Sequence, residues 1–249
     1  MGKEGTDVAR GASAMVLLDD NFATIVRAVR EGRRIYDNIR RFVKYTLTSN
    51  AGEIWVMFLG PFLGFPLPLL PLQILWINLV TDGLPGLALA REPAEPTVMQ
   101  RPPRPPDESI FAHGVTWHIG WVGALIGGVS LAGLGWAYSS GADNWQTVVF
   151  TTLVLAQLGH SLAVRSETAP SFGRRFARNP ALLGAVALTI ALQMVVVYVP
   201  WFQDIFRTEA LTAQQLGVCV GLALVVPVAV EIEKMLVRRG LLYDRVRTA

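Results

Sequence analysis

Two acidic side chains stand inside long apolar stretches of this 249-residue sequence. Glu53 lies within the apolar run 45–64, and Asp82 lies within the run 69–90. An ionised group at membrane depth is costly and usually functional, because it must face a protein interior or a water-filled path and not lipid. The two acids are therefore the first candidates for a functional site.

Each acid has polar neighbours at helical spacing. Asn50 precedes Glu53 by three residues, while Asn78, Thr81 and Asp82 follow an i, i+3, i+4 pattern. Side chains at these spacings share one face of a helix. Carboxylate, amide and hydroxyl oxygens are the ligands that hard cations such as Ca²⁺ prefer, and no Cys or His pair nearby favours a softer metal. This pattern predicts a cation site between two helices.

The second of these helices also carries helix-breaking residues next to Asp82. Pro85 has no N–H, so the carbonyl of Thr81 loses its helical partner, and Gly83 and Gly86 allow the backbone to open. Broken helices at membrane depth are typical of transport sites. For Asn50, Asn78 or Thr81 taken singly, the alternative to cation binding is a side chain that only forms a hydrogen bond to a neighbouring helix.

A further polar pair, Gln157 and His160, lies in a later apolar run. We interpret Gln157 as a candidate sixth cation ligand and His160 as a helix–helix contact. His118 is expected at the membrane interface without a role. Glu231 and Glu233 are expected to be solvated near Lys234.

Composition places the chain in a membrane. Hydrophobic residues make up 52% of the sequence and charged residues 16%, with a mean hydropathy of +0.40. Each membrane-spanning helix needs about 20 apolar residues. The predicted fold is all-α, a six-helix transmembrane bundle with a long stalk helix, and the six predicted spans are 45–64, 69–90, 115–138, 145–164, 181–202 and 213–230.

Lys and Arg residues predict the orientation of these spans. Six alternating spans place all of the 22 Lys and Arg residues except Arg207 on one side of the membrane. Positive residues concentrate in cytoplasmic segments, so we expect a multi-pass protein of the cell membrane with both termini in the cytoplasm. The net charge of +3 is then explained by topology and anionic lipid, and nucleic acid is not expected as a partner.

The segment before the first span is expected to be helix, strand and helix. Thr6 can cap a short helix that ends by Ser13, residues 14–18 favour a brief buried strand, and Asn21 can cap a second helix. These elements cannot bury an independent core, so the segment is expected to be a small α/β remnant of a larger domain.

These patterns predict the division of the chain. The expected units are residues 1–31, the remnant of a cytoplasmic domain; 32–44, the stalk helix; 45–90, the ion-binding helix pair; 91–113, an extended, Pro-rich cytoplasmic connector; 114–236, a four-helix support bundle; and 237–249, a cytoplasmic tail.

Several long motifs in order resemble the C-terminal part of the P-type cation-transporting ATPases, and most closely the sarcoplasmic-reticulum-type calcium pumps. They are GTDVARGASAMVLLDDNFATIV, EGRRIYDNIRRFVKYTLTSNAGE, LQILWINLVTDGLPGLALA and MQRPPRPP. The resemblance implies that residues 1–31 end a phosphorylation domain and that the six spans are the fifth to tenth of a pump. It also implies that Asn50, Glu53, Asn78, Thr81 and Asp82 are metal ligands.

The chain departs from that family in two respects. The two-calcium pumps carry a Glu where this chain has Gln157, which puts one family site or its charge in doubt. The family's phosphorylated Asp in DKTGT, its TGES loop, its GDGxND motif and its fourth-helix acid do not occur here. We therefore expect no catalytic residues and no ATPase activity from this chain alone; ATP and Mg²⁺ would act only in an intact pump.

The leading interpretation is the ion-binding portion of an ATP-driven calcium pump, with the bilayer, the transported cation and the N-terminal half of the pump as partners. One alternative is the same kind of pump for Mn²⁺, Na⁺ or H⁺. Another is a non-catalytic, truncated membrane module. A channel is disfavoured, because the polar residues cluster at one depth.

Overall fold

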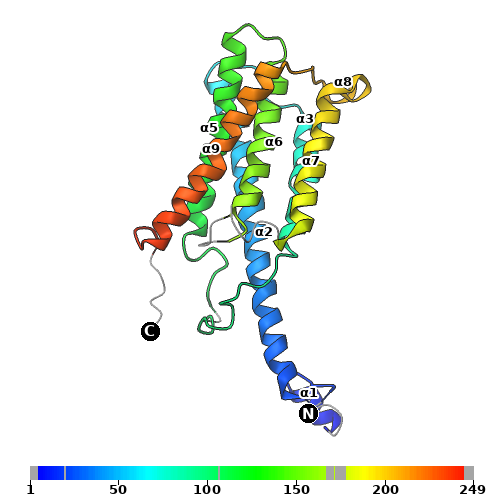
Figure 1. Ribbon diagram of the computed structural model, residues 1–249, viewed down its shortest axis with the longest axis vertical. Coiled ribbons are helices and arrows are strands. Elements are labelled where there is room, and N and C mark those ends of the chain that lie inside the picture. Colours follow the sequence, from blue (N-terminus) through cyan, green and yellow to red (C-terminus); the bar gives the residue numbers. More distant parts are fainter. Residues whose placement is uncertain (1–4, 20, 106, 167–170, 172–177, 244–249) are drawn as a thin grey trace.

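The chain folds into a bundle of helices from which one long helix projects (Figure 1). The computed structural model describes residues 5–19, 21–105, 107–166, 171 and 178–243. Within these residues the secondary structure is helical and contains no strand. The prediction of an all-α fold is confirmed for the described part of the chain.

The helices follow one another in the order that the apolar runs predict. Their bounds are α1 Asp7–Ala12, α2 Phe22–Phe62, α3 Pro71–Trp76, η1 Ile77–Thr81, α4 Gly83–Leu89, α5 Val115–Ser139, α6 Trp145–Ala163, α7 Pro180–Tyr198, α8 Pro200–Phe206 and α9 Ala213–Arg238. Here η1 is a π-helical turn, and α3, η1 and α4 together form one helical segment.

Helix α2 is a single helix that contains both the predicted stalk and the first helix of the predicted ion site. The side chain of Asn21 accepts a hydrogen bond from the backbone N–H of Ala23, which caps its start. The helix has 41 residues, and at 1.5 Å per residue it is about 60 Å long. Its N-terminal half projects beyond the bundle, and we call that end of the bundle the stalk end (Figure 1).

Glycines let α5 lie against α2 at very short distance. A Cβ added to Gly123 would lie 2.6 Å from the Cβ of Ala51, and one added to Gly127 would lie 2.6 Å from the Cβ of Trp55. A larger side chain at either position would push the two helices apart. Helix α6 packs against α9 and α5, and α4 packs against α7, so the ion-site helices are held from two sides.

Four helical segments of the described chain are long and apolar enough to cross a membrane. They are Pro71–Leu89, Val115–Ser139, Pro180–Tyr198 and Ala213–Arg238. Helices α2 and α6 are not among them, so the count of six spans remains a prediction. Helix α6 carries several buried polar side chains, Thr147, Thr151, Thr152, Gln157 and His160.

Two local predictions were wrong. Residues 14–18 form no strand, because a strand needs a neighbouring strand for its backbone hydrogen bonds and the described chain offers none. The predicted fifth span is split, since α7 ends at Tyr198 and a new short helix, α8, starts at Pro200. Pro200 has no N–H and ends the α7 hydrogen-bond ladder.

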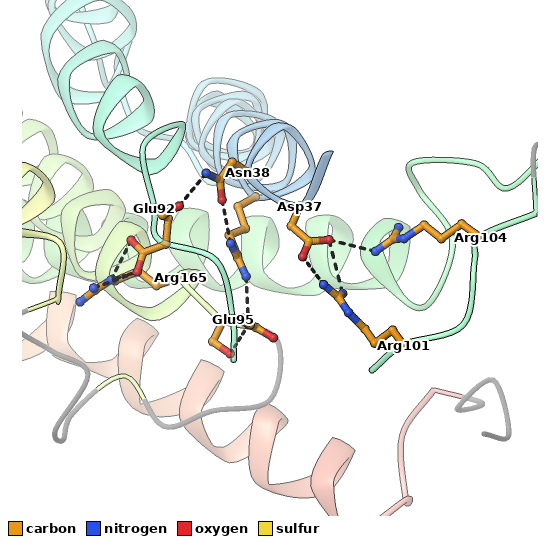
Figure 2. A network of polar contacts seen from close by, with 9 residues as sticks. Asp37, Asn38, Glu92, Glu95, Arg101, Arg104 and Arg165 are labelled. Atoms are coloured by element: carbon orange, nitrogen blue, oxygen red, sulfur yellow. Dashed lines mark hydrogen bonds and ion pairs between the residues drawn. The ribbon is translucent and has the colours of Figure 1, made fainter. Parts of the chain in front are cut away.

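The connector is folded back onto the stalk rather than extended. It contains turns, and Asp37 of α2 forms ion pairs with Arg101 and with Arg104 (Figure 2). Arg33 donates to the carbonyls of Val98 and Arg101 at 2.9 and 2.7 Å. The six prolines restrict the connector backbone, but polar contacts to α2 decide its path. Pro106 lies outside the described residues.

A second set of contacts joins the start of the connector to three helices. Glu92 accepts a hydrogen bond from Arg165, just beyond α6, at 2.9 Å (Figure 2). It also accepts one from Asn179, the N-cap of α7, at 2.7 Å. Asn38 of α2 donates to the backbone carbonyl of Glu92 at 2.8 Å. Glu92 and Arg165 are buried, so this contact fixes the stalk ends of α2, α4, α6 and α7 relative to one another.

Candidate cation site

Glu53 is held between two helices by amide groups. Its side chain is 7% exposed. The amide of Asn78 in η1 donates to Oε2 at 3.0 Å, and the amide of Gln157 in α6 donates to Oε1 at 3.1 Å. Three of the predicted ligands, from three separate segments, therefore meet at one carboxylate. Asn78 is the most exposed of them.

The second helix is modified where its acid lies. Residues Ile77–Thr81 form a π-helical turn, and the N–H of Asp82 bonds to the carbonyl of Ile77, five residues back. A π-turn inserts an extra residue into a helix and occurs often at functional sites. The carbonyl of Thr81, which Pro85 deprives of its helical partner, accepts a hydrogen bond from the hydroxyl of Tyr45 at 3.0 Å. The carbonyl is thus paired by a side chain, while Gly83, Pro85 and Gly86 themselves lie in the regular helix α4.

Asp82 lies inside the same region without a firm partner. Its side chain is 4% exposed, and neither carboxylate oxygen has a hydrogen-bond partner in the described part of the chain. The hydroxyls of Tyr45 and Ser49 approach it, and Glu53 is close enough to repel it electrostatically. A buried carboxylate with no bound cation or hydrogen bond is costly, so this arrangement favours a positively charged ligand.

Other oxygens around Asp82 share this property. Within the described residues, the buried side-chain oxygens that lack a hydrogen-bond partner all belong to one group of residues: Thr46, Ser49, Asn50, Thr81, Asp82 and Gln157. Buried polar atoms are nearly always paired, so each exception calls for an explanation such as an ion. Carboxylate, amide and hydroxyl oxygens fit a hard cation such as Ca²⁺.

The described residues contain no cluster of three or more His, Cys, Asp or Glu side chains suited to hold a metal. A cation here would therefore depend on amide and hydroxyl oxygens in addition to the carboxylates of Glu53 and Asp82. The assignment of all six candidate ligands remains a prediction, and in the described part of the chain no hydrogen bond joins the side-chain oxygen of Asn50 or the Thr81 hydroxyl to another member of the set.

Sequence reasoning missed three residues of this region on α2. Tyr45 bonds the freed carbonyl, the hydroxyl of Ser49 approaches Asp82, and the hydroxyl of Thr46 is buried without a hydrogen-bond partner in the described residues. Thr46, Ser49 and Glu53 stand at i, i+3 and i+7, which is the spacing of one helical face. That periodicity was the signal that could have found them.

The expectations of an interfacial His118 and a solvated Glu233 were wrong, whereas the expected ion pair beside Lys234 is present with the partly exposed Glu231. His118 is fully buried, and its Nδ1 lies 2.6 Å from Oε2 of Glu233. Lys234 is buried and bonds Glu231 at 2.8 Å. These side chains face α5, α6 and the connection between α6 and α7, so protein surrounds them where solvent was expected. His160 is a helix–helix contact, as predicted.

Comparisons with known proteins identify the family of this chain. A family model described as "Cation transporting ATPase, C-terminus" matches residues 66–236. A "Calcium-transporting ATPase" of Bacillus subtilis (strain 168) is 48% identical over 226 residues, which cover 90% of this chain and 25% of that protein. A "Calcium-transporting ATPase 1" of Bacillus cereus is 37% identical over 253 residues, covering 94% of this chain and 28% of that protein.

A "Calcium-transporting ATPase 1" of the yeast Yarrowia lipolytica is 36% identical over 222 residues, covering 87% of this chain and 24% of that protein. The chain spans about a quarter of the length of these relatives. The family match covers more than half of the chain and includes Asn78, Thr81, Asp82 and Gln157. The chain therefore belongs to the family of cation-transporting ATPase C-terminal regions, as the sequence motifs indicated.

Proposed function

We propose that this chain forms the ion-binding transport portion of an ATP-driven calcium pump, and that Ca²⁺ is its cargo. The observation that carries the proposal is the group of buried, unpaired oxygens around Glu53 and Asp82. The two carboxylates would balance the charge of one divalent ion. The printed names of the relatives favour calcium.

The stalk would couple this site to events outside the membrane. Glu53 lies on the same unbroken helix as residues 22–44, so a displacement of the stalk is transmitted to it directly. The missing pump activities would come from a polypeptide that supplies the remaining three quarters of the relatives' length. The proposed topology has six spans, both termini in the cytoplasm and residues 1–31 as the end of a phosphorylation domain.

Cation binding by the chain itself can be measured with Tb³⁺, a luminescent substitute for Ca²⁺. The chain is placed in lipid nanodiscs, and Tb³⁺ emission sensitised by tryptophan is followed while Ca²⁺ is added; Trp76 is two residues from Asn78. We expect Ca²⁺ to displace Tb³⁺. Glu53→Gln and Asp82→Asn should each weaken binding at least tenfold, which corresponds to about 1.4 kcal/mol.

Asp204→Asn is the matched control, because Asp204 is an exposed acid on α8, away from the site. Binding by this variant should equal that of the unchanged chain. Displacement of Tb³⁺ by Mn²⁺ or Na⁺ at lower concentration than by Ca²⁺ would assign another cargo. If the double variant Glu53→Gln, Asp82→Asn still gave sensitised Tb³⁺ emission, the proposed cation site would be contradicted.

A further inference from the structure

A second buried polar cluster lies at the stalk end of the bundle, apart from the cation site. It joins His118 of α5, His160 of α6 and Glu233 of α9. The Nε2 atoms of the two imidazoles are 3.1 Å apart, and the rings stack with their centroids 5.3 Å apart. Both histidines are fully buried, and Glu233 is 5% exposed.

The hydrogen-bond partners fix where protons sit in this cluster. Glu233 accepts from Trp121 Nε1 at 3.3 Å and from the hydroxyl of Tyr243, and its Oε2 lies 2.6 Å from Nδ1 of His118. Burial and the neighbouring Glu233 raise the pKa of Tyr243, so its hydroxyl stays a donor. Since Trp121 and Tyr243 both donate to Glu233, we assign Glu233 as a carboxylate and His118 as the Nδ1–H tautomer that donates to it.

The contact between the two imidazoles then requires one shared proton. Two lone pairs, or two N–H groups, would repel each other at 3.1 Å. When both rings are neutral, Nε2 of His118 is the acceptor and Nε2 of His160 is the donor. That state leaves a lone pair on Nδ1 of His160, and this atom is buried with no hydrogen-bond partner in the described residues.

We propose that His118 and His160 form one binding site for a single exchangeable proton, with Glu233 as its counter-ion. A proton bound at Nδ1 of His160 forms a new N–H bond there. The Nε2 proton of His160 then leaves that ring and forms an N–H bond at Nε2 of His118. The result is a His118 imidazolium paired with the Glu233 carboxylate, and one proton has been added.

The charges around the pair limit the site to one added proton. Lys44 of α2 faces both His160 and Glu233, and Lys234 of α9 faces His160 while it bonds Glu231. Among the described residues, the other titratable neighbours are Tyr45, stacked on His160 at 5.8 Å, and Tyr243. A second added proton would place two imidazolium ions in contact beside two ammonium groups.

The proposed proton site lies next to the cation site but is separate from it. Tyr45 stacks on His160 and bonds the carbonyl of Thr81, so its ring separates the two clusters. Tyr243 closes the cluster at the stalk end, with its ring against Gly114. The proton site rests on the geometry of the histidine pair alone, and it stands whether or not the chain transports a cation.

The direct test is nitrogen NMR of the histidine rings. The chain has three histidines, so ¹⁵N-histidine-labelled protein in nanodiscs gives signals that His113→Gln, His118→Gln and His160→Gln assign. At pH 9 we expect His118 as the Nδ1–H tautomer and His160 as the Nε2–H tautomer. On acidification to pH 5, both should change together as the pair takes up one proton, and His160 should become the Nδ1–H tautomer.

His113 is the internal reference, because it is exposed and lies 3.2 Å from Glu108, outside the cluster. The His113→Gln variant should keep the coupled change, and His118→Gln should abolish it at His160. Two outcomes overturn the proposal: rings of the unchanged chain that stay in one state from pH 9 to pH 5, or two imidazolium ions formed independently. Both outcomes are observed on the unchanged chain, so misfolding of a variant cannot produce either of them.

Discussion

At the scale of single residues, the proposed cation site depends on oxygens that the fold buries without hydrogen-bond partners. Glu53 is satisfied by two amides, whereas Asp82 keeps both oxygens unpaired. The hydroxyl of Tyr45 donates to the carbonyl of Thr81, which has no helical partner because Pro85 lacks an N–H. One side chain therefore replaces the hydrogen bond that the helix loses. The region therefore contains both stabilising contacts and the unpaired atoms that a ligand needs.

Tyr45→Phe should show how much that compensation contributes. The variant leaves the Thr81 carbonyl buried without its partner, and we expect the free energy of unfolding to fall by about 1–3 kcal/mol. The measurement is unfolding in mixed micelles of detergent and sodium dodecyl sulfate. Tyr138→Phe is the control, because Tyr138 is exposed and its hydroxyl makes no hydrogen bond in the described residues. Equal losses in the two variants would refute the role of Tyr45.

Much of the site was predictable from the sequence, since Asn50, Glu53, Asn78, Thr81 and Asp82 stand in long apolar runs at helical spacing. Polar atoms in such runs are rare enough to be noticed. The contact between His118 and Glu233 was not predictable, because it joins residues 115 positions apart and depends on how α5 packs on α9. Helical periodicity shows which face of a helix is polar, but not which helix faces it.

At the scale of helices, the close contact of α2 and α5 positions Glu53. Glycines on α5 replace side chains that would hold the helices apart, and Gly52 on α2 faces Ile126 in the same way. The lengths of the helices were predicted well, because about 20 apolar residues are needed for a span. The end of α7 was missed, since Pro200 lies inside an otherwise continuous apolar run.

Gly123→Val should disturb this contact. A Cβ at residue 123 would lie 2.6 Å from Ala51, so the helices must separate, and we expect a loss of about 1–3 kcal/mol in the free energy of unfolding. Gly120→Val is the matched control on the same helix, because a Cβ there meets nothing within 4 Å. The same denaturation assay measures both variants. A Gly123→Val variant as stable as Gly120→Val would contradict the packing described for α2 and α5.

At the scale of the whole molecule, the connector holds the stalk and the bundle together. Asp37 of α2 binds connector arginines, and Glu92 binds Arg165 beyond α6 (Figure 2). Glu92 also binds Asn179 before α7. The proline content predicted a restricted backbone, but these long-range ion pairs could not be read from the sequence. A movement of the stalk is therefore shared with the stalk ends of several helices.

Glu92→Gln should destabilise the chain far more than removal of an exposed ion pair. The variant removes the buried ion pair with Arg165 and weakens the hydrogen bond that Asn179 donates, and losing such a charged hydrogen-bond partner costs about 1.5–3 kcal/mol. Glu31→Gln removes the exposed pair with Arg34 and should cost less than about 1 kcal/mol. Thermal unfolding in one detergent compares the two variants. Similar losses would show that the connector contact is not a structural anchor.

The proposed topology makes a separate prediction for the two ends of the bundle. In a Cys219→Ala background, Ser140→Cys lies at the loop after α5, and Ser109→Cys lies in the connector. A membrane-impermeant maleimide added to intact cells should label the first and not the second. Labelling of residue 109 from outside, with residue 140 protected, would reverse the proposed orientation.

The central claim is that the carboxylates of Glu53 and Asp82 share one bound cation. Carboxylate ¹³C NMR of Asp- and Glu-labelled protein in nanodiscs tests this most directly, with the two signals assigned by Glu53→Gln and Asp82→Asn. Both signals should shift along a single Ca²⁺ binding curve, while that of Asp204 stays fixed. Signals that follow different curves, or a response by only one of the two acids, would contradict the account.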